Sequence, residues 1–446
     1  MKRFLSLLLF LTFLHIQNSI AQKNDVILNA KQVKMVIDTL GKNMSSYYVF
    51  PDIGLKIDQY LKAQYKAGVY NNITSPQKLA DKLYTDIKTV HVDPHMGIAY
   101  SPDFDKQRIQ DKNAAQKVKD DSIRLNQLKE TNFNFKKVEI LPGNIGYLQF
   151  NQFVGDIKNA KPIVTAALTF LSNTKALIID LRYNGGGSPD MVSQIESYFF
   201  KQKVHMNDLV DRLGKDTSIF YADPAKTDGI TLSMPLYILT SNQTFSGAED
   251  FSYGMQSVKR ATIVGDTTNG GAHPVSTFSI TNGLFARIPF ARSLNPYTHT
   301  DWEGTGVIPD IATPSANALE KAIETIYANR LANAVHDEEK KMISWQLHRL
   351  HATYHPFKID TKILEQYEGI YDNGDLKLYI KNGALYCQNK QRRNYTFELI
   401  PIANSTFLWS ENTDLEIEFI KNTNGNYTTM NFLGPGGVLW QVSRGN

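Results

Sequence analysis

Cysteine is nearly absent from this chain of 446 residues, because Cys387 is the only one. A single thiol can form neither an internal disulfide nor a cysteine zinc cluster. Its neighbours, Ala384-Leu-Tyr-Cys-Gln, alternate as in a strand, which indicates a structural residue and not a thiol nucleophile. The scarcity of cysteine therefore excludes folds and mechanisms built on this side chain.

Excess charge of one sign is also missing. The formal net charge is +4, from 48 basic and 44 acidic residues, and no dense basic block occurs. This balance argues against nucleic acid as a partner. A glycine run is present, but no Gly-Lys-Ser/Thr ending and no G-x-G-x-x-G frame accompany it, which argues against a nucleotide-binding loop.

Long hydrophobic runs are lacking after the first residues. Phe4 to Leu14 is apolar but short for a bilayer span, and it follows the basic pair Lys2-Arg3. Small residues at Ser19-Ile20-Ala21 suit signal peptidase. We therefore expect an export signal over residues 1–21, a secreted or periplasmic protein, and no transmembrane segment after the signal is removed.

Changes of texture divide the rest of the chain into four segments. Apolar residues at helical spacing indicate a helical domain, a polar stretch follows, strands then alternate with helices, and short alternating strands come last. Strands that alternate with helices predict an α/β core with a largely parallel sheet. The expected boundaries are 22–100 for the helical domain, 101–134 for a charged connector, 135–345 for the α/β domain, and 360–446 for an antiparallel β-domain.

Two buried strands lead into polar turns. Ala176–Leu181 runs into Arg182-Tyr-Asn-Gly-Gly-Gly187, and Leu236–Leu239 runs into a turn and a helix that begins near Ser246. Such loops gather at the carboxyl edge of a parallel sheet, where ligands bind. The glycines allow close approach of backbone N–H groups to a reacting carbonyl, or form a plain turn. Ser246 is a nucleophile beside helix N–H groups, or an ordinary N-cap.

Three further side chains are candidates for chemistry. His95, in the turn Asp93-Pro-His95, is a catalytic base or a surface histidine. His91, Asp93 and His95 could also ligate a metal, but alternate residues on an extended run are a weak pattern for that. His273 is a competing base, with a hydrogen-bonded loop histidine as the alternative. Glu303 fits a carboxylate that orients a histidine, or a surface turn.

Together these motifs resemble the S41 peptidases, the group of tail-specific proteases, tricorn-core proteases and interphotoreceptor retinoid-binding protein. The resemblance spans roughly Val26 to Ile326 and implies a crotonase-like (ClpP/crotonase) α/β core. The matching segments, in chain order, are Tyr48-Val-Phe-Pro51 with Asp93-Pro-His95, Asp180-Leu-Arg-Tyr-Asn-Gly-Gly-Gly187, Thr244-Phe-Ser-Gly-Ala-Glu-Asp-Phe251, Gly265-Asp-Thr-Thr-Asn-Gly-Gly-Ala-His-Pro274 and Glu303-Gly-Thr-Gly-Val-Ile-Pro-Asp310.

The resemblance assigns the nucleophile and the oxyanion donors. Ser246 matches the family's nucleophile. Gly247 and Gly186 match the residues whose backbone N–H groups form the oxyanion hole, and Gly185 is the alternative for the second donor.

The resemblance also assigns the base. One branch of the family uses a lysine in the loop after the nucleophile helix, but this loop reads Asn269-Gly-Gly271, and Lys259 lies on the helix side. A Ser–Lys dyad is therefore disfavoured. The tricorn-like branch uses a histidine and a glutamate that match His95 and Glu303. No typical PDZ segment precedes Phe135, which argues against recognition of C-terminal tails.

The sequence thus predicts an exported serine peptidase that cleaves peptide bonds through an acyl-enzyme, with the triad Ser246, His95 and Glu303. Its expected partner is a peptide or protein substrate, and no cofactor or metal is required. One alternative is a non-catalytic carrier of apolar ligands, of the retinoid-binding type. The other is an esterase that uses the same triad.

Overall fold

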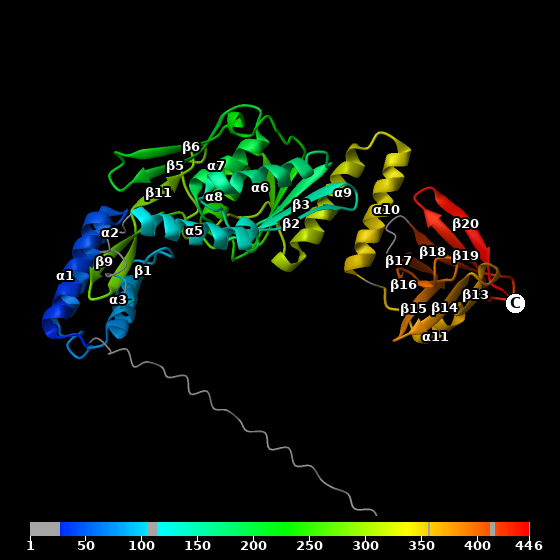
Figure 1. Cartoon of the computed structure of the whole chain (residues 1–446), viewed down its shortest axis with the longest axis horizontal. Helices are drawn as coiled ribbons and strands as arrows, with labels where there is room; N and C mark the ends of the chain where they lie inside the picture. Colours follow the sequence, from blue (N-terminus) through cyan, green and yellow to red (C-terminus); the bar gives the residue numbers. More distant parts are fainter. Residues whose placement is uncertain (1–26, 103, 105–113, 356, 411–414, 446) are drawn as a thin grey trace, which may run out of the picture. The chain divides into compact units, whose positions relative to one another are not determined.

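The computed structural model describes residues 27–102, 104, 114–355, 357–410 and 415–445 (Figure 1). The predicted export signal lies outside these residues. The chain divides into two compact units. The first comprises residues up to Val92, Met96–Asp111 and Val275–Ile288, and the second comprises Asp93–His95, Lys112–Pro274 and Pro289–Asn446.

The first unit packs three helices with a small antiparallel sheet of order β1-β10-β9. The first helix starts with a capping box between Asn29 and Gln32, and the third starts at Ser75, whose side chain accepts from the N–H of Lys78. Strands β9 and β10 join this unit from far along the chain. The elements are α1 (Ala30–Tyr47), α2 (Pro51–Lys66), α3 (Pro76–Val90), β1 (Gly97–Tyr100), β9 (Val275–Thr281) and β10 (Leu284–Pro289).

The centre of the second unit is a sheet of order β12-β8-β7-β4-β3-β2. All neighbouring pairs are parallel except β2 with β3, which form a hairpin at one edge. Every residue of β4 and of β7 is buried, as expected for parallel strands covered on both faces. The strands are β2 (Phe135–Leu141), β3 (Ile145–Phe150), β4 (Ala176–Asp180), β7 (Leu236–Thr240), β8 (Ala261–Gly265) and β12 (Ile311–Ala312).

Helices cover both faces of this sheet (Figure 1). Leu177 and Ile179 of β4 face one layer of helices, whereas Ile178 between them faces the other, as the strand's two-residue period requires. The first layer holds α6 (Ile157–Phe170), α7 (Pro189–Glu196) and α8 (Gly247–Ser257), and the second holds α9 (Ala318–Asn333) and α10 (Asp337–Tyr354). The expected domain end at residue 345 falls inside α10.

The remaining elements of the second unit include α5 (Ala114–Glu130) and a sheet of order β11-β5-β6, formed by β5 (Val204–Asp211), β6 (Thr217–Ala222) and β11 (Ala291–Leu294). After α11 (Thr361–Leu364), eight strands pair in chain order around a core of their own, and a bridge from Tyr371 to Arg444 links the first strand to the end of the last. They are β13 (Gly369–Tyr371), β14 (Leu376–Lys381), β15 (Ala384–Asn389), β16 (Tyr395–Pro401), β17 (Thr406–Trp409), β18 (Glu416–Lys421), β19 (Tyr427–Gly434) and β20 (Gly437–Ser443).

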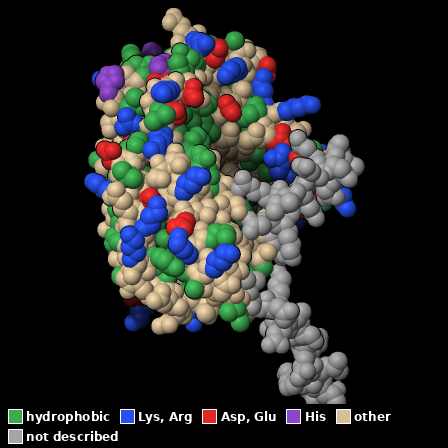
Figure 2. Space-filling model, turned by 90° about the vertical axis from the view of Figure 1, so that its left-hand side faces the viewer, with side chains coloured by type: hydrophobic (Ala, Val, Ile, Leu, Met, Phe, Trp, Pro, Cys, Tyr) green, Lys and Arg blue, Asp and Glu red, His purple; other side chains and the backbone are tan. Residues whose placement is uncertain are grey.

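The surface mixes charges of both signs. On the face shown in Figure 2, Lys and Arg side chains are spread out, with Asp, Glu and apolar side chains between them. Within the described residues, no helix combines the length and apolar character that a membrane crossing requires.

Candidate active site

Ser246 lies between β7 and α8 in an unusual backbone conformation. Its φ is 55° and its ψ is −121°. The N-cap residues Asn29 and Ser75 have φ of −93° and −82°, in the extended region where N-caps are normally found. A non-glycine residue with the Ser246 angles costs on the order of 1–3 kcal/mol, and such strain clusters at functional sites. The ordinary N-cap reading of Ser246 therefore does not account for its geometry.

The fully buried carboxylate of Glu249, in the first turn of α8, ties this serine to a second loop. One oxygen accepts from the backbone N–H of Ser246 at 2.7 Å and from that of Gly271 at 2.9 Å. The other accepts from the Thr268 hydroxyl at 2.5 Å and from the Gly270 N–H at 2.6 Å. Burial raises the pKa of Glu249, and these four donors oppose the rise. Glu249 thus fixes the loop after β8 against the serine turn.

The glycine run after β4 touches the serine turn directly. Gly186 has φ of +93°, and a Cβ added there would lie 2.6 Å from the Phe245 carbonyl oxygen, 2.7 Å from the Gly247 nitrogen and 2.8 Å from the Ser246 Cβ. No side chain fits such a space, and the positive φ favours glycine independently. The backbone of this loop therefore approaches Ser246 closely. Of the two explanations for the glycine run, a close backbone approach or a plain turn, the geometry favours the close approach.

The backbone N–H groups available near Ser246 are not both those of the expected pair, Gly186 and Gly247. The N–H of Gly186 donates to the Asn184 side chain at 2.8 Å, so this donor is already engaged. Among the described residues, the N–H groups of Gly187 and Gly247 have no hydrogen-bond partner, and the Gly187 nitrogen lies 3.0 Å from the position of a Cβ on Gly247. The free donors beside the serine are thus those of Gly187 and Gly247. The side chain of Asn184, which accepts from the Gly186 N–H, accounts for the difference.

His95 belongs to the same compact unit as Ser246 and packs against the residue that precedes this serine. Its ring stacks on Phe245, the residue before the serine, with 4.6 Å between ring centroids and 29° between planes. A Cβ on Gly271 would lie 2.5 Å from His95 Cε1 and 2.2 Å from a ring carbon of Phe245. The absence of a side chain at Gly271 is therefore what lets the two rings stack.

His273 lies in a group that also contains Asp93 and Glu303. Its Nδ1 is 3.0 Å from an oxygen of Asp93 and 3.4 Å from an oxygen of Glu303, and the imidazole is almost completely buried. The same Glu303 oxygen accepts from the Ala272 N–H at 2.5 Å. One donor atom each of Asp93, His95 and Glu303 lie within 4.8 Å of one another. The structure thus brings both candidate histidines and the predicted glutamate together.

The environment of Glu303 makes its carboxylate easy to protonate. Burial raises its pKa to about 7, while His273 and the Ala272 N–H work in the opposite direction and Asp93 adds to the rise. Groups with pKa values displaced in this way by burial and by a charged partner concentrate at functional sites. The Glu303 carboxylate contacts His273 and the Ala272 N–H, and one of its oxygens lies within 4.8 Å of a ring nitrogen of His95.

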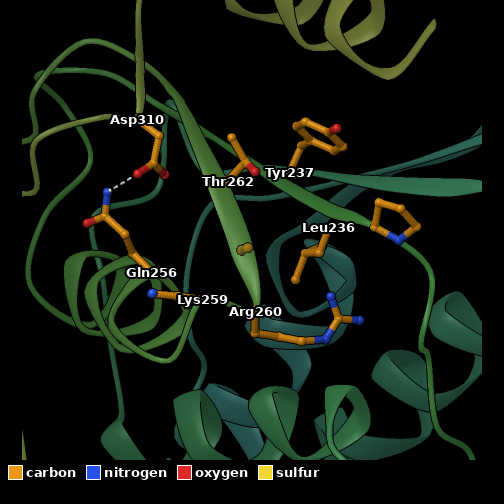
Figure 3. A pocket seen from close by; sticks show the side chains of 9 residues that line it. Leu236, Tyr237, Gln256, Lys259, Arg260, Thr262 and Asp310 are labelled. Carbon is orange, nitrogen blue, oxygen red and sulfur yellow. Dashed lines mark hydrogen bonds between the residues drawn. The ribbon is translucent and has the colours of Figure 1, made fainter. Parts of the chain in front are cut away.

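A cavity at the opposite end of the sheet is lined by Lys259 (Figure 3). It has a volume of about 480 Å³ and is lined at the start of β7 and β8 by Leu236, Arg260 and Thr262. Lys259 follows the end of α8, whereas Ser246 precedes its beginning. Eleven helical residues rise about 16 Å. Lys259 is therefore too far from Ser246 to act as its base.

Three carboxyl ends of strands converge at the site: β4 leads into the glycine run, β7 into Ser246, and β8 into the loop that holds His273. This defines a mixed α/β protein with a serine, two histidines and two carboxylates at one edge of a parallel sheet. Residues 144–313 match the profile of peptidase family S41, and residues 17–142 match that of the N-terminal domain of peptidase S41 in eukaryotic IRBP. The chain belongs to the S41 peptidase family.

Curated relatives match over part of their length. A carboxyl-terminal-processing peptidase 2 from Arabidopsis thaliana, a chloroplastic protein, is 29% identical over 184 residues, which cover 40% of this chain and 34% of the relative. A carboxyl-terminal-processing protease from Synechocystis is 30% identical over 172 residues, which cover 38% of each protein. The matched region thus spans little more than a third of these relatives.

Similar solved structures include a protein from Parabacteroides merdae described as a peptidase. It has a TM-score of 0.49 and 18% identity, and the match covers 68% of this chain and 99% of that one. The photosystem II D1 C-terminal processing protease has a TM-score of 0.43 and 16% identity, with coverage of 64% and 93%.

Proposed function

We propose that this protein is an exported serine peptidase that cleaves peptide bonds through an acyl-enzyme. The observation that carries the proposal is the Ser246 turn itself. A strained serine at the start of a helix lies against a glycine run, and the residue before this serine stacks on an imidazole. Nucleophile, base and backbone donors are the three components that acyl transfer requires. Export rests on the pattern of residues 1–21.

In this mechanism His95 is the base. It takes the Ser246 hydroxyl proton as Oγ attacks the substrate carbonyl carbon, and the carbonyl π electrons move to oxygen. When the tetrahedral intermediate collapses, the C–N bond breaks and the imidazolium gives its proton to the leaving amine. Water then attacks the acyl ester by the same route, which releases the acid and restores Ser246. The developing oxyanion is bound by the N–H groups of Gly247 and, in place of the expected Gly186, Gly187.

We assign the base to His95 and not to His273 because their surroundings differ. His273 is buried with its Nδ1 against the carboxylates of Asp93 and Glu303, whereas His95 packs on the residue next to the nucleophile. Glu303, as the third member of the triad, stabilises the positive charge that forms on His95. Its proximity to both histidines supports this role, with His273 holding the carboxylate in place.

The enclosing architecture is part of the proposal. We infer that residues 135–345 form a crotonase-like catalytic domain, that the helical segment 22–100 and the charged connector 101–134 precede it, and that the β-domain 360–446 is a separate module without catalytic groups. Peptide or protein substrates follow from the proposed reaction. The core of the C-terminal strands consists of apolar side chains, which is consistent with a structural or docking role.

The test is cleavage of a mixed peptide library by the mature chain, with products identified by mass spectrometry. We expect new termini with the native protein and none with Ser246→Ala. Parallel assays with p-nitrophenyl esters separate a peptidase from an esterase: ester turnover without peptide turnover favours the esterase. A carrier of apolar ligands would cleave neither substrate and would quench or enhance the fluorescence of an added lipid probe.

A further inference from the structure

The donor atoms of Asp93, His95 and Glu303 form a compact group at the proposed base. We propose that these three side chains bind a divalent zinc ion, and that the ion reversibly silences the enzyme by occupying His95. The silencing rests on the proposed function, whereas the binding does not. This role is distinct from catalysis, for which the mechanism above needs no metal.

The donor set suits zinc. It offers one imidazole nitrogen and two carboxylate oxygens, all within 4.8 Å of one another. Zinc binds histidine and carboxylate ligands in such combinations, often with three protein ligands and one open position, whereas calcium and magnesium prefer oxygen ligands alone. Ligand atoms about 2.1 Å from a tetrahedral ion lie about 3.4 Å apart. The ligand atoms therefore need to approach one another by up to about 1.4 Å, which rotation of the side chains can supply.

Surrounding hydrogen bonds already orient the two carboxylate ligands. The backbone N–H of His95 donates to one oxygen of Asp93 at 2.9 Å, and His273 Nδ1 contacts the other at 3.0 Å. The Ala272 N–H holds one oxygen of Glu303, while the other is buried and has no hydrogen-bond partner among the described residues. Outer contacts of this kind are what fix ligands in metal sites. The unpartnered Glu303 oxygen gives the site a lone pair that no protein group uses.

Occupation of this site would stop the proposed reaction directly. The imidazole lone pair that accepts the Ser246 proton would instead be donated to zinc. Glu303 would lose its freedom to stabilise an imidazolium. The chain would then be inactive in the presence of free zinc and would recover when a chelator removes the ion.

Binding is tested on the full mature chain carrying Ser246→Ala, so that the result does not depend on peptidase activity. The probe is Co²⁺, whose visible absorption is strong in low-coordinate nitrogen and oxygen sites, followed by competition with Zn²⁺. We expect one ion per chain, displaced by zinc. Asp93→Asn should weaken Zn²⁺ binding by at least tenfold, and His273→Gln, which removes an outer contact, by about 10–100-fold. Glu303→Gln serves as a second ligand variant if Asp93→Asn fails to fold.

His205→Gln is the matched control. His205 pairs with Asp208 at 2.7 Å on β5. The substitution therefore removes a histidine from a histidine–carboxylate pair outside the proposed metal site. The variant should bind Co²⁺ like the parent chain. Absence of stoichiometric binding, or affinities that fall in the His205 variant and not in the Asp93 and Glu303 variants, overturns the proposed site.

Silencing is tested separately with Ser246 present. Zinc should abolish labelling of Ser246 by a fluorophosphonate, and EDTA should restore it. Binding with undiminished labelling would keep the metal site and refute the silencing. Binding in a chain that never labels would leave the site intact and refute the proposed peptidase function instead.

Discussion

Asp250→Asn should stabilise the core around α8, and only at high pH. Asp250 is buried beside the nucleophile turn, and it lies near Glu196, which is also fully buried. Burial raises the pKa of Asp250 from its ordinary 3.8 to about 7, against an opposing hydrogen bond from Asn207. Burial and the neighbouring Asp250 likewise raise the pKa of Glu196. The protein therefore buries at least one carboxyl group that prefers to be neutral.

The sign and size of the effect follow from this pKa. Below pH 3.8 Asp250 is protonated in both states and contributes no difference. Between 3.8 and about 7 the unfolded chain releases the proton while the folded chain keeps it, so the native protein loses stability as the pH rises. At about 1.4 kcal/mol per pH unit, the loss of unfolding free energy between pH 3.8 and pH 7 reaches up to about 4 kcal/mol. Asn is neutral at every pH. The free energy of unfolding of the variant minus that of the native chain should therefore be about 2–4 kcal/mol larger at pH 8 than at pH 4.

The assay is urea unfolding at pH 4 and pH 8, followed by hydrogen exchange of peptides from α8, so that the C-terminal strands do not contribute. Asp211→Asn is a control of opposite sign. Desolvation raises the pKa of that exposed carboxyl, but backbone N–H groups of Lys215, Asp216 and Leu213 outweigh this and lower it. Because a lowered pKa changes stability only below the ordinary value of 3.8, the stability that Asp211→Asn loses should be nearly the same at pH 4 and at pH 8. An Asp250→Asn difference that is equal at the two pH values would refute the reasoning.

Three other substitutions test the site. Gly186→Ala should destabilise the fold by about 2–5 kcal/mol, because its Cβ would meet backbone atoms at a positive φ. Thermal unfolding of Gly185→Ala, where no atom lies within 4 Å of the added Cβ, should change little. Equal shifts of the unfolding temperature in the two variants would contradict the close approach of the glycine run to Ser246. Glu249→Gln should lower the free energy of urea unfolding by about 3 kcal/mol, since an amide N–H would face a hydrogen-bond donor. Native-like stability of this variant would show that Glu249 does not hold the loop after β8 in place. His95→Ala should lower peptide turnover by about 10²–10⁴-fold with unchanged circular dichroism, and full activity would move the base assignment to His273.

Local patterns were sufficient to locate much of this architecture. The buried strands Ala176–Asp180 and Leu236–Thr240 are continuous apolar runs, and the family motifs place Ser246 after the second of them. The mixed α/β class follows from strands alternating with helices. Glu249 was also within reach, because a serine followed three residues later by glutamate is the pattern of a capping box.

Contacts between distant segments were not predictable in the same way. Asp93 and His273 are 180 residues apart, and nothing in either turn specifies their pairing. The hairpin of β9 and β10 lies between β8 and β12 of the central sheet in sequence but belongs to the first unit, because its apolar side chains join the core of α1–α3. The engagement of the Gly186 N–H depends on the rotamer of Asn184, which no spacing rule gives.

The central claim is that Ser246 is a nucleophile activated by His95. The most direct test is intact-mass and peptide mapping of the mature chain after exposure to a fluorophosphonate, which forms an O–P bond and releases fluoride. We expect one adduct per chain, on Ser246, that is absent in Ser246→Ala and forms at least a hundredfold more slowly in His95→Ala. An adduct on another residue, or labelling of Ser246 at an undiminished rate without His95, would contradict the account.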